Sequence, residues 1–326
     1  MILVTGATGH VGNVLIRELL AAGERVRALV LPNDRCRSLE GLDLERVEGN
    51  VLDPASLERA MSGVDVVYHL AGIISILPGA EPLMRRVNVD GARNTALAAL
   101  RTGVRRMVHV SSIHALERLP HGLVVDERTP FIVDNLNDIY DQTKAEGARV
   151  VLDVAAQGLD AMVVCPTGII GPHDYLDSEM GNLILNFARK KLHFLVKGAY
   201  DFVDVRDVAR GLTLAAEKGR RGEVYILSGS RVEILQIKQI VQEVVGIRTP
   251  QIVMPMWLAR AATAFAESFY RLTRSIPKFT RYSLQVVQEN CNFSHAKAQQ
   301  ELGYVPRPLR ETIADILTWR KGLATA

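Results

Sequence analysis

The sequence is poor in cysteine, carries only a small excess of positive charge, with a formal net charge of +3 at pH 7, and contains no block of like charges. Its 326 residues include three cysteines, Cys36, Cys165 and Cys291, without a CxxC pair, and its histidines lack the spacing of metal ligands. We therefore expect a reducing compartment, no disulfide bonds and no bound metal. The 39 lysines and arginines are dispersed among 36 aspartates and glutamates, a balance that argues against nucleic acid as a partner.

Two further absences concern targeting and membranes. The chain begins MILVTG, which already enters a glycine turn and leaves no room for a charged and apolar leader. The most apolar late stretch, residues 252–272, is interrupted by Arg260 and Glu267 and is too polar for a membrane span. We therefore expect a cytoplasmic protein.

Short apolar runs alternate with helical patterns through the first half of the chain. Most of the runs are β-branched and do not alternate between apolar and polar residues, as in strands that are covered on both faces. They lie at residues 2–5, 26–31, 45–48, 64–71, 107–111 and 161–165. Helical patterns lie between them at residues 11–21, 56–61, 89–100 and 141–156. This alternation predicts an α/β fold with a doubly wound parallel sheet of the Rossmann type.

The alternation of strands and helices ends after about Pro172, and helical patterns dominate from there on. They cover residues 179–191, 205–218, 234–245 and 255–274, and one further strand is predicted at 223–227. We expect a dinucleotide-binding domain at residues 1–172 and a smaller, mostly helical substrate lobe at residues 173–326. The two are interleaved, because part of residues 200–232 should return to the large sheet.

A glycine-rich turn follows the first predicted strand and opens the first predicted helix. Its sequence is TGATGHVG, at residues 5–12. In a dinucleotide-binding turn the first glycine allows the tight bend, the second lets the backbone approach a pyrophosphate, and the third lets the helix pack on the strand. The alternative is an ordinary turn at a strand end. The strand before it and the helix after it favour a pyrophosphate site at the helix N-terminus.

The end of the second strand indicates which dinucleotide binds. NAD sites place an acidic residue there, about 20 residues after the turn, but this chain has Leu31. Asp34 follows, and Arg35 and Arg37 stand in the loop, where a guanidinium can pair with a 2′-phosphate. The sequence therefore favours NADP slightly over NAD. The alternative interpretation is that both arginines form a solvated surface.

Three residues suggest hydride-transfer chemistry. Tyr140 and Lys144 are four residues apart at the start of a predicted helix and so share one face. Hydride loss from a carbinol requires a base for the remaining proton, and a tyrosine with a pKa of about 10 is too weakly ionised at pH 7. We expect the Lys144 ammonium to lower the pKa of Tyr140. Ser112 ends a strand at the ligand-binding edge and can donate to the substrate oxygen.

Further segments occur in one order along the chain. They are TGATGHVG at 5–12, GNVLD at 49–53, HLAG at 69–72, NVDGARN at 88–94, VSS at 110–112, YDQTK at 140–144, GP at 171–172 and FVDVRDVA at 202–209. With these the chain resembles the extended short-chain dehydrogenase/reductase family along nearly its whole length. The resemblance implies a Rossmann fold, a nicotinamide cofactor and a triad of Ser112, Tyr140 and Lys144. Lys144 would also hold the nicotinamide ribose.

The resemblance also implies how the cofactor lies. Asn50, where the family usually carries aspartate, and Val51 would flank the adenine, while Ala71 and Gly72 would run under the cofactor. Asn88 would sit behind the lysine in a water relay, and the backbone after Pro166 would contact the carboxamide. The expected cofactor-binding residues are Thr5, Gly6, Thr8, Gly9, His10, Val11, Gly12, Arg35, Asn50, Val51, Leu70, Ala71, Gly72, Asn88, Val110, Tyr140, Lys144, Pro166, Thr167 and Gly168.

Later segments point to one branch of this family. Sugar-nucleotide epimerases and dehydratases tend to show Arg-Pro-x-Asn where this chain has CPTG at residues 165–168, and the clearest basic cluster here is RKK at 189–191. The segments VDERTPF at 125–131, PKFTRYS at 277–283 and FSHAKAQQELGYVPRP at 293–308 resemble the 3β-hydroxysteroid dehydrogenase and dihydroflavonol reductase branch.

We therefore expect an NAD(P)-dependent oxidoreductase that interconverts a secondary alcohol and a ketone on a hydrophobic small molecule. One alternative is a nucleotide-sugar epimerase or dehydratase. A second is a non-catalytic dinucleotide-binding sensor, although such relatives generally lose the tyrosine or the lysine.

Three expectations concern the surroundings of the site. The amphipathic stretch at residues 255–274 should close the substrate pocket or pack on a partner subunit, with a membrane contact as the less favoured alternative. His114 should form part of a polar pocket wall. By the resemblance, the helices carrying residues 88–100 and 141–156 pair between subunits, so we expect a homodimer.

Overall fold

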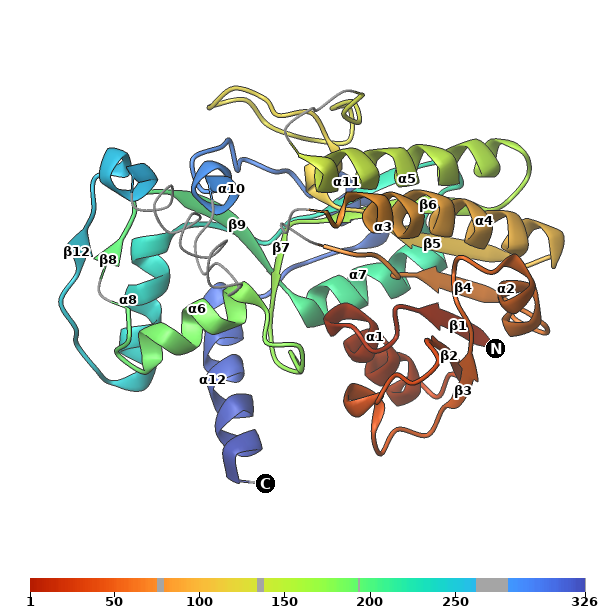
Figure 1. Ribbon diagram of the computed structural model, residues 1–326, viewed down its shortest axis with the longest axis horizontal. Coiled ribbons are helices and arrows are strands. Elements are labelled where there is room, and N and C mark those ends of the chain that lie inside the picture. The colour runs from red at the N-terminus through yellow and green to blue at the C-terminus, as the bar shows by residue number, and fades with distance from the viewer. Residues whose placement is uncertain (75–78, 134–137, 193, 262–280, 326) are drawn as a thin grey trace.

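A large sheet with helices on both faces carries most of the first half of the chain (Figure 1). The computed structural model describes residues 1–74, 79–133, 138–192, 194–261 and 281–325. A smaller lobe lies beyond the edge at which the sheet strands end, and the chain crosses between the two parts more than once. The ends of the sheet strands therefore face the smaller lobe.

The seven strands of the large sheet are all parallel and follow the order β10-β6-β5-β4-β1-β2-β3. Their bounds are β1 Ile2–Thr5, β2 Val26–Val30, β3 Glu45–Glu48, β4 Val66–His69, β5 Arg106–Val110, β6 Ala161–Pro166 and β10 Val224–Leu227. The predicted doubly wound sheet is confirmed. Its order reverses between β1 and β4, and the crevice outside the carboxyl ends at such a point is where ligands bind.

Alternate residues of each strand face opposite cores, because side chains in a strand point to opposite faces. Ile2 and Val4 pack into the core beneath α1 and α7, whereas Leu3 packs into the core beneath α2, α4 and α5. The helices of the first core are α1 His10–Ala21, α7 Val205–Lys218 and α11 Ala296–Leu302. Those of the second are α2 Pro54–Ala60, α4 Gly91–Arg101 and α5 Ile139–Ala156. The apolar residues of a central strand such as β1 are thus explained by burial on both faces, whereas β3 lies at the sheet edge and is mostly exposed.

Late residues return to the large sheet. After an excursion into the smaller lobe the chain forms α7 and then β10, which pairs with β6 at the sheet edge. The short helix α3 (Glu81–Arg85) and a π-helical turn (Arg86–Asp90) precede α4 on the opposite face. The two parts of the molecule therefore share the segment between residues 199 and 227, and neither is continuous in sequence.

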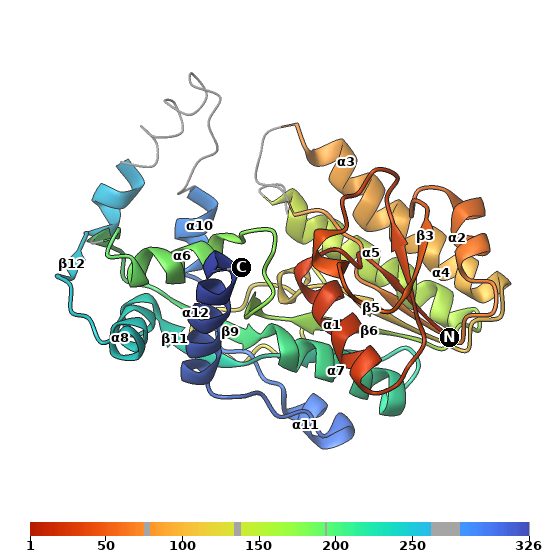
Figure 2. The same ribbon diagram turned by 90° about the horizontal axis from the view of Figure 1, so that it is seen from below.

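The smaller lobe contains helices and two small sheets. Three helices pack together in its core, as Figure 2 also shows: α6 Glu179–Ala188, α8 Ile234–Val245 and α12 Leu309–Thr325. One sheet has the order β11-β9-β7, and the other pairs β12 with β8. Their bounds are β7 Gly168–Ile170, β8 Phe194–Leu195, β9 Ala199–Asp204, β11 Ser230–Glu233 and β12 Ile252–Val253. These strands were not predicted, because polar residues interrupt β9 (AYDFVD) and β11 (SRVE), and β7, β8 and β12 have only two or three residues.

One helix ends earlier in the structure than the sequence predicts, and parts of two other predicted segments lie outside the described residues. The helix predicted at residues 179–191 stops at Ala188, because Lys190 takes a left-handed φ of 58°. Of the amphipathic stretch at 255–274, the structure describes helix at residues 256–261, and residues 262–274 lie outside the described part. Residues 277–280 of the segment PKFTRYS are likewise outside it. Within the described ranges, no helix is both long and apolar enough to cross a membrane.

Candidate active site

The turn between β1 and α1 is a close backbone cradle. Gly6 has a φ of 69°, and a Cβ atom there would lie 2.6 Å from the Ala71 nitrogen. A Cβ atom at Gly12 would lie 2.2 Å from the Gly6 carbonyl oxygen, so the helix packs directly on the strand exit. Gly9 precedes the helix, Val11 lies in its first turn, and no described side chain caps it. The first amides of α1 are therefore available to a pyrophosphate, and the turn fits a dinucleotide.

Two polar side chains that were predicted to bind the cofactor also hold this turn in place. Thr5 is fully buried, and its hydroxyl forms a 2.7 Å hydrogen bond with His69 Nδ1 on the neighbouring strand. His10 Nε2 lies 2.9 Å from the carbonyl oxygen of Pro172, where the chain enters the smaller lobe. The glycine turn is thus held both to the sheet and to the lobe.

The loop after β2 lies where the adenosine ribose is expected. Leu31, in the position of the missing acidic residue, is 55% exposed. Arg35 and Arg37 are exposed, and neither forms an ion pair within the part of the chain that the structure describes. The Thr8 hydroxyl donates a 2.9 Å hydrogen bond to Asp34, which joins this loop to the glycine turn.

The segment after β3 contains a turn held by the Asn50 side chain, followed by the apolar side chain of Val51. Asn50 Oδ1 accepts a 2.9 Å hydrogen bond from the Leu52 amide, so this oxygen holds the local turn. Val51 is buried and lies so close to Gly91 that a Cβ atom there would be 2.8 Å from Val51 Cγ2. The predicted adenine contacts of Asn50 and Val51 would come from the backbone and from this apolar surface.

The segment after β4 brings further predicted residues together. Leu70, Ala71 and Gly72 leave the strand, and a Cβ atom at Gly72 would lie 3.3 Å from Asn88 Oδ1 and 3.6 Å from Lys144 Nζ. The buried Asn88 donates to the Thr143 hydroxyl at 3.0 Å. This contact ties the chain before α4 to α5. Asn88 thus lies near the lysine, as the resemblance implied.

The structure brings Ser112, Tyr140 and Lys144 to one place. Ser112 follows β5 and is buried, and its oxygen accepts a 3.2 Å hydrogen bond from the His114 amide. Asp138 caps α5 by accepting from the Tyr140 amide at 3.1 Å, which starts the helix at the tyrosine. Lys144 Nζ donates a 2.8 Å hydrogen bond to the carbonyl oxygen of Val110, at the end of β5. All three lie at the carboxyl edge of the sheet.

The expected effect of Lys144 on Tyr140 needs correction. Burial raises the pKa of Tyr140; a hydrogen bond with Ser112 lowers it in part, and Asp141 and Asp138 add to the rise. Burial also lowers the pKa of Lys144 to about 8. The expectation was wrong because desolvation disfavours both charged forms and because the ammonium is directed at Val110. The protein's own groups thus keep Tyr140 protonated at neutral pH.

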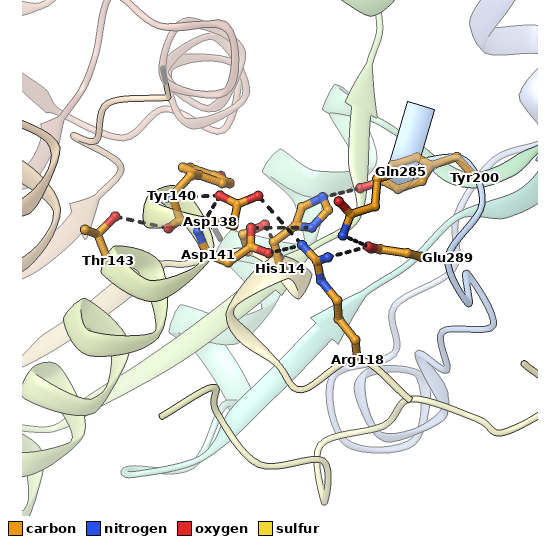
Figure 3. Close-up of polar contacts among 10 residues, drawn as sticks. His114, Arg118, Asp138, Tyr140, Asp141, Thr143, Tyr200, Gln285 and Glu289 are labelled. Carbon is orange, nitrogen blue, oxygen red and sulfur yellow. Dashed lines mark hydrogen bonds and ion pairs between the residues drawn. The ribbon is translucent and has the colours of Figure 1, made fainter. Parts of the chain in front are cut away.

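A charged network lies against the start of α5 (Figure 3). The Asp141 side chain has no exposed surface, and its Oδ2 accepts a 2.6 Å hydrogen bond from Arg118. The same guanidinium lies 3.7 Å from Asp138 and pairs with Glu289 from the segment after α10 (Arg281–Val286). One cation is therefore shared among three carboxylates, and it joins the helix of Tyr140 to the C-terminal part of the chain.

His114 and Tyr200 form a second polar contact in this region (Figure 3). His114 Nε2 lies 2.7 Å from the Tyr200 hydroxyl, and the two rings stack with centroids 6.0 Å apart. His114 also meets the Tyr140 ring edge-on at 6.3 Å. Tyr200 belongs to β9, so the smaller lobe contributes this residue. His114 was expected only as a polar wall, and here it connects two tyrosines.

The exit of β6 carries the last predicted cofactor residues. Pro166 ends β6, and the Thr167 hydroxyl donates a 2.6 Å hydrogen bond to the buried Asp201 of β9. Gly168 begins β7, and a Cβ atom there would lie 2.5 Å from Cε1 of Tyr200. The backbone after Pro166 is therefore fixed against β9, directly beside the tyrosine that contacts His114.

Sequence reasoning missed Arg118, Asp141 and Tyr200. The position of Asp141 directly after Tyr140 was an available signal. An acidic residue in the first turn of a helix, beside a predicted catalytic tyrosine, is a candidate for a charged contact at the site. Arg118 and Tyr200 carry no local signal. They reach the site only through the loop after β5 and through strand β9.

Buried neutral histidines lie beneath and beside the site. His69 and His109, on neighbouring strands, stack with ring centroids 5.2 Å apart. Burial lowers the pKa of His69 to about 3 and that of His114 to about 4, and it places the pKa of His109 well below its usual value. These side chains must gain protons when the chain unfolds in acid.

We therefore expect stability to fall as the pH drops from about 6.5 toward 4. In this window the unfolded chain binds more protons than the folded chain, and each such histidine removes up to about 1.4 kcal/mol of unfolding free energy per pH unit. The variant His109→Met should show a shallower acid decline in urea-unfolding measurements, whereas His121→Gln, at an exposed loop position, should follow the unmodified protein. Equal slopes for all three proteins would contradict this assignment.

The described residues contain no group of three or more histidines, cysteines and carboxylates placed to hold a metal ion.

A model of the NAD dependent epimerase/dehydratase family matches residues 2–228.

Two related sequences match almost end to end. The chain is 37% identical to sterol demethylase protein B of Methylococcus capsulatus, over 97% of each chain. It is 30% identical to the 4-hydroxy-2-methyl-3-oxo-4-farnesyl-3,4-dihydroquinoline-1-oxide ketoreductase of Stigmatella aurantiaca, over 96% of this chain and 94% of that one. The solved structure of a nucleoside-diphosphate-sugar epimerase from Pseudomonas aeruginosa superposes with a TM-score of 0.79 and 26% identity, over 99% and 97% of the two chains.

Proposed function

Because the chain belongs to the NAD-dependent epimerase/dehydratase family, we propose that it interconverts a secondary alcohol and a ketone on a hydrophobic small molecule. It is an enzyme of the extended short-chain dehydrogenase/reductase type. The observation that carries the proposal is the convergence of Ser112, Tyr140 and Lys144 at the carboxyl edge of the sheet, next to the glycine cradle. A proton donor, a polarising hydroxyl and an ammonium are the groups that carbonyl reduction requires.

Each side chain has a separate role. A bound nicotinamide dinucleotide supplies or accepts the hydride. The Ser112 oxygen already accepts from the His114 amide, so its proton can turn toward the substrate oxygen. Tyr140 gives a proton to that oxygen during reduction, and its raised pKa keeps the proton in place at pH 7. Lys144, beside Gly72 and Val110, would hold the nicotinamide ribose.

NADP is the preferred cofactor in this proposal. Two exposed arginines without ion-pair partners among the described residues, Arg35 and Arg37, follow a strand that ends in Leu31 rather than in an acidic residue. Charge-assisted contacts to a 2′-phosphate are expected from such a loop.

The variant Arg35→Ser should therefore raise the KM for NADPH about tenfold and leave the KM for NADH unchanged. The reason is that one charge-assisted hydrogen bond contributes about 1.5 kcal/mol. Steady-state kinetics with both cofactors measure the ratio. Arg25→Ser is the matched control, since Arg25 is also exposed but stands before β2, at the opposite end of the strand. If the unmodified enzyme prefers NADH and Arg35→Ser alters neither constant, NADP is not its cofactor.

A hydrophobic substrate is supported by the apolar side chains around a small cavity of about 30 Å³ beside His114 and Tyr200, which Ser112, Tyr140 and Lys144 do not line. Half of its lining is apolar, contributed by Ile113, Leu116, Leu119, Val125, Val286 and Phe293. Its arginine, Arg118, is already bound to Asp141 and Glu289. The names of the two sequence relatives, a sterol enzyme and a farnesylated-quinoline ketoreductase, agree with an apolar ring compound.

A nucleotide-sugar epimerase or dehydratase is the second candidate, and the likeness to the Pseudomonas aeruginosa epimerase favours it. Such a substrate carries a diphosphate that needs fixed cations. Arg118 is committed to carboxylates, and the basic residues 189–191 follow α6 at its end near β8, on the side of the lobe away from the large sheet (Figure 1). Neither cation group is placed for a diphosphate beside Tyr140.

The proposal is tested by incubating the purified enzyme with NADPH or NADH and a panel of cyclic ketones, and separately with UDP-sugars. Cofactor oxidation that matches alcohol formation from a ketone supports the proposal. Conversion of a UDP-sugar without net change of cofactor would establish the second candidate instead. Tight cofactor binding without conversion of any compound would indicate a sensor.

We also propose that the enzyme is a homodimer that pairs through α4 and α5. These helices lie side by side on one face of the large sheet (Figure 1). A shallow groove between them is lined by Val89, Arg93, Glu146, Arg149, Val150, Leu152 and Asp153. A monomeric mass in light scattering at micromolar concentration would contradict the pairing.

A further inference from the structure

The smaller lobe ends in a surface that the proposed reaction does not use. Strands β8 and β12 pair there in parallel, and a helical turn at residues 256–261 follows β12. The end of α6 leads into β8 in the same region. In both views these elements lie at the end of the lobe farthest from the large sheet (Figure 1 and Figure 2). We call this region, residues 186–192, 194–198 and 246–261, the outer tip.

The outer tip is basic and contains no aspartate or glutamate. Its six cationic side chains are all exposed: Arg189, Lys190, Lys191, Lys197, Arg248 and Arg260. Among the residues that the structure describes, the first five form no ion pair, and Arg260 donates to the Gln288 side chain at 2.9 Å. These six positive charges compare with a net charge of +3 for the whole chain. Positive charge is therefore concentrated at this end of the molecule.

The neighbouring helix α8 does not compensate this charge. Its one carboxylate, Glu243, stands near the helix end that leads into the outer tip, and it pairs with Arg310 of α12. An anion that meets the outer tip therefore encounters cations that are not already bound to carboxylates of the described part of the chain.

Large apolar side chains are exposed on the same tip. Trp257 is 71% exposed, Ile252 48% and Leu258 41%. Both residues of β12, Ile252 and Val253, are exposed, so this short strand has no buried face. A single exposed apolar side chain is ordinary, but here four of them occur within residues 252–258. They form an apolar patch on a strand and on the helical turn that follows it.

The combination of charge and apolar exposure indicates the kind of partner. Cations alone would suit any polyanion, and apolar side chains alone would suit many protein surfaces. A bilayer with anionic lipids matches both, because its headgroups attract lysine and arginine while its interfacial layer accommodates tryptophan and aliphatic side chains. The position also agrees, since a tip at the end of the molecule can meet a flat surface.

We propose that the outer tip docks the protein on the surface of a bilayer that contains anionic lipids. Trp257 and Leu258 enter the interfacial layer, and the six cations lie among the headgroups. The contact is peripheral and reversible, because few apolar side chains insert and charge supplies much of the attraction. The inference does not depend on the proposed reaction.

Flotation with extruded vesicles tests the proposal. The probes are vesicles of phosphatidylcholine alone and vesicles that also contain about 30% phosphatidylglycerol, each at about 0.1 M and about 0.5 M salt. We expect binding to the anionic vesicles at the lower salt concentration and release at the higher one, because salt screens exposed charges. Vesicles without the anionic lipid should bind at least about tenfold more weakly.

Tryptophan fluorescence reports whether the tip itself enters the bilayer. The chain has two tryptophans, so in Trp319→Phe the emission comes from Trp257 alone. This emission should shift to shorter wavelength when anionic vesicles are added, because the indole leaves water. In Trp257→Phe the emission comes from Trp319, which packs against His173 and Tyr175, and it should not shift.

A matched pair of charge variants locates the contact. Arg189→Gln with Lys191→Gln removes two charges of the outer tip and should lower the vesicle affinity about 25-fold, because each cation near an anionic surface contributes about a fivefold change. Arg25→Gln with Arg105→Gln removes the same net charge from exposed positions directly before β2 and β5, at the opposite edge of the large sheet. This control should keep the affinity of the unmodified protein. Urea unfolding should be unchanged in both, since all four side chains are exposed.

Several outcomes would overturn the proposal. They are absence of vesicle binding at both salt concentrations, equal binding to both kinds of vesicle, and a Trp257 emission that bound vesicles leave unchanged. An equal loss of affinity in the two charge variants would show a response to net charge rather than a docking tip. Retention on immobilised RNA without vesicle binding would identify a polyanion as the partner and would also contradict docking on a bilayer.

Discussion

Replacing Tyr140 with phenylalanine should lower turnover by about 10²- to 10⁴-fold, the range observed when a general acid or base is removed. Only the hydroxyl is lost, so the ring still packs beside His114 and the cofactor affinity should remain nearly unchanged. The measurement is kcat with the best ketone of the panel, together with the dissociation constant of NADPH from fluorescence titration. Reduction suffers because the proton donor of the proposed reaction is lost, whereas Ser112 polarises the substrate oxygen.

The control for this variant is Tyr304→Phe, which removes another buried phenol. The Tyr304 hydroxyl donates to the Ser228 carbonyl at 3.1 Å and takes no part in the proposed reaction, so turnover should persist. Lys144→Ala should lower both turnover and cofactor affinity, because Lys144 lies beside Gly72 as well as near the end of β5. Weaker cofactor binding with intact turnover in Tyr140→Phe would count against the assignment.

Replacing Arg118 with leucine should lower the free energy of unfolding by about 3 kcal/mol. Breaking a buried ion pair typically costs about 3–5 kcal/mol, because it leaves a buried charge without compensation. The lower end applies here, since the Arg118 side chain is 28% exposed whereas Asp141 has no exposed surface. Urea unfolding measures the change. The loss should shrink at lower pH, because burial already raises the pKa of Asp138 and Glu289 and their protonation relieves the repulsion.

Two matched variants check the origin of this loss. Arg128→Leu removes an arginine whose side chain is 92% exposed and paired with Asp126, and such a surface pair contributes little to stability. The double variant Arg118→Leu with Asp141→Leu removes both charges and should regain much of the stability. A single-variant loss no larger than that of Arg128→Leu would show that the network does not stabilise the fold.

Local patterns predicted the elements that depend on short stretches of sequence. The unbroken apolar residues of β1 and the glycines that follow it determine a strand, a turn and a helix start, because each conformation is decided by neighbours a few residues away. The same holds for Tyr140 and Lys144, which share a face by helical spacing alone. The strands β7, β9 and β11 escaped prediction because β7 has only three residues, polar residues interrupt the other two, and all three pair with partners distant in sequence.

The effect of burial on charge could not be predicted from spacing. The four-residue separation of Tyr140 and Lys144 suggested that the ammonium would acidify the phenol, yet burial raises the pKa of Tyr140 and lowers that of Lys144. Desolvation depends on every element packed around a group, and here these include β5, the loop after it and β9. Spacing along one helix contains none of that information.

By itself, then, the sequence determined the parallel sheet, the glycine cradle and the set of residues proposed to carry the chemistry, because each arises from contacts within one βαβ unit or one helix. Only the tertiary structure decided what surrounds that chemistry. Arg118 reaches Asp141 from a loop, Glu289 joins them from the C-terminal part, and Tyr200 reaches His114 from a strand of the smaller lobe. Such contacts arise when distant segments pack together, and their charges and proton positions follow from that packing.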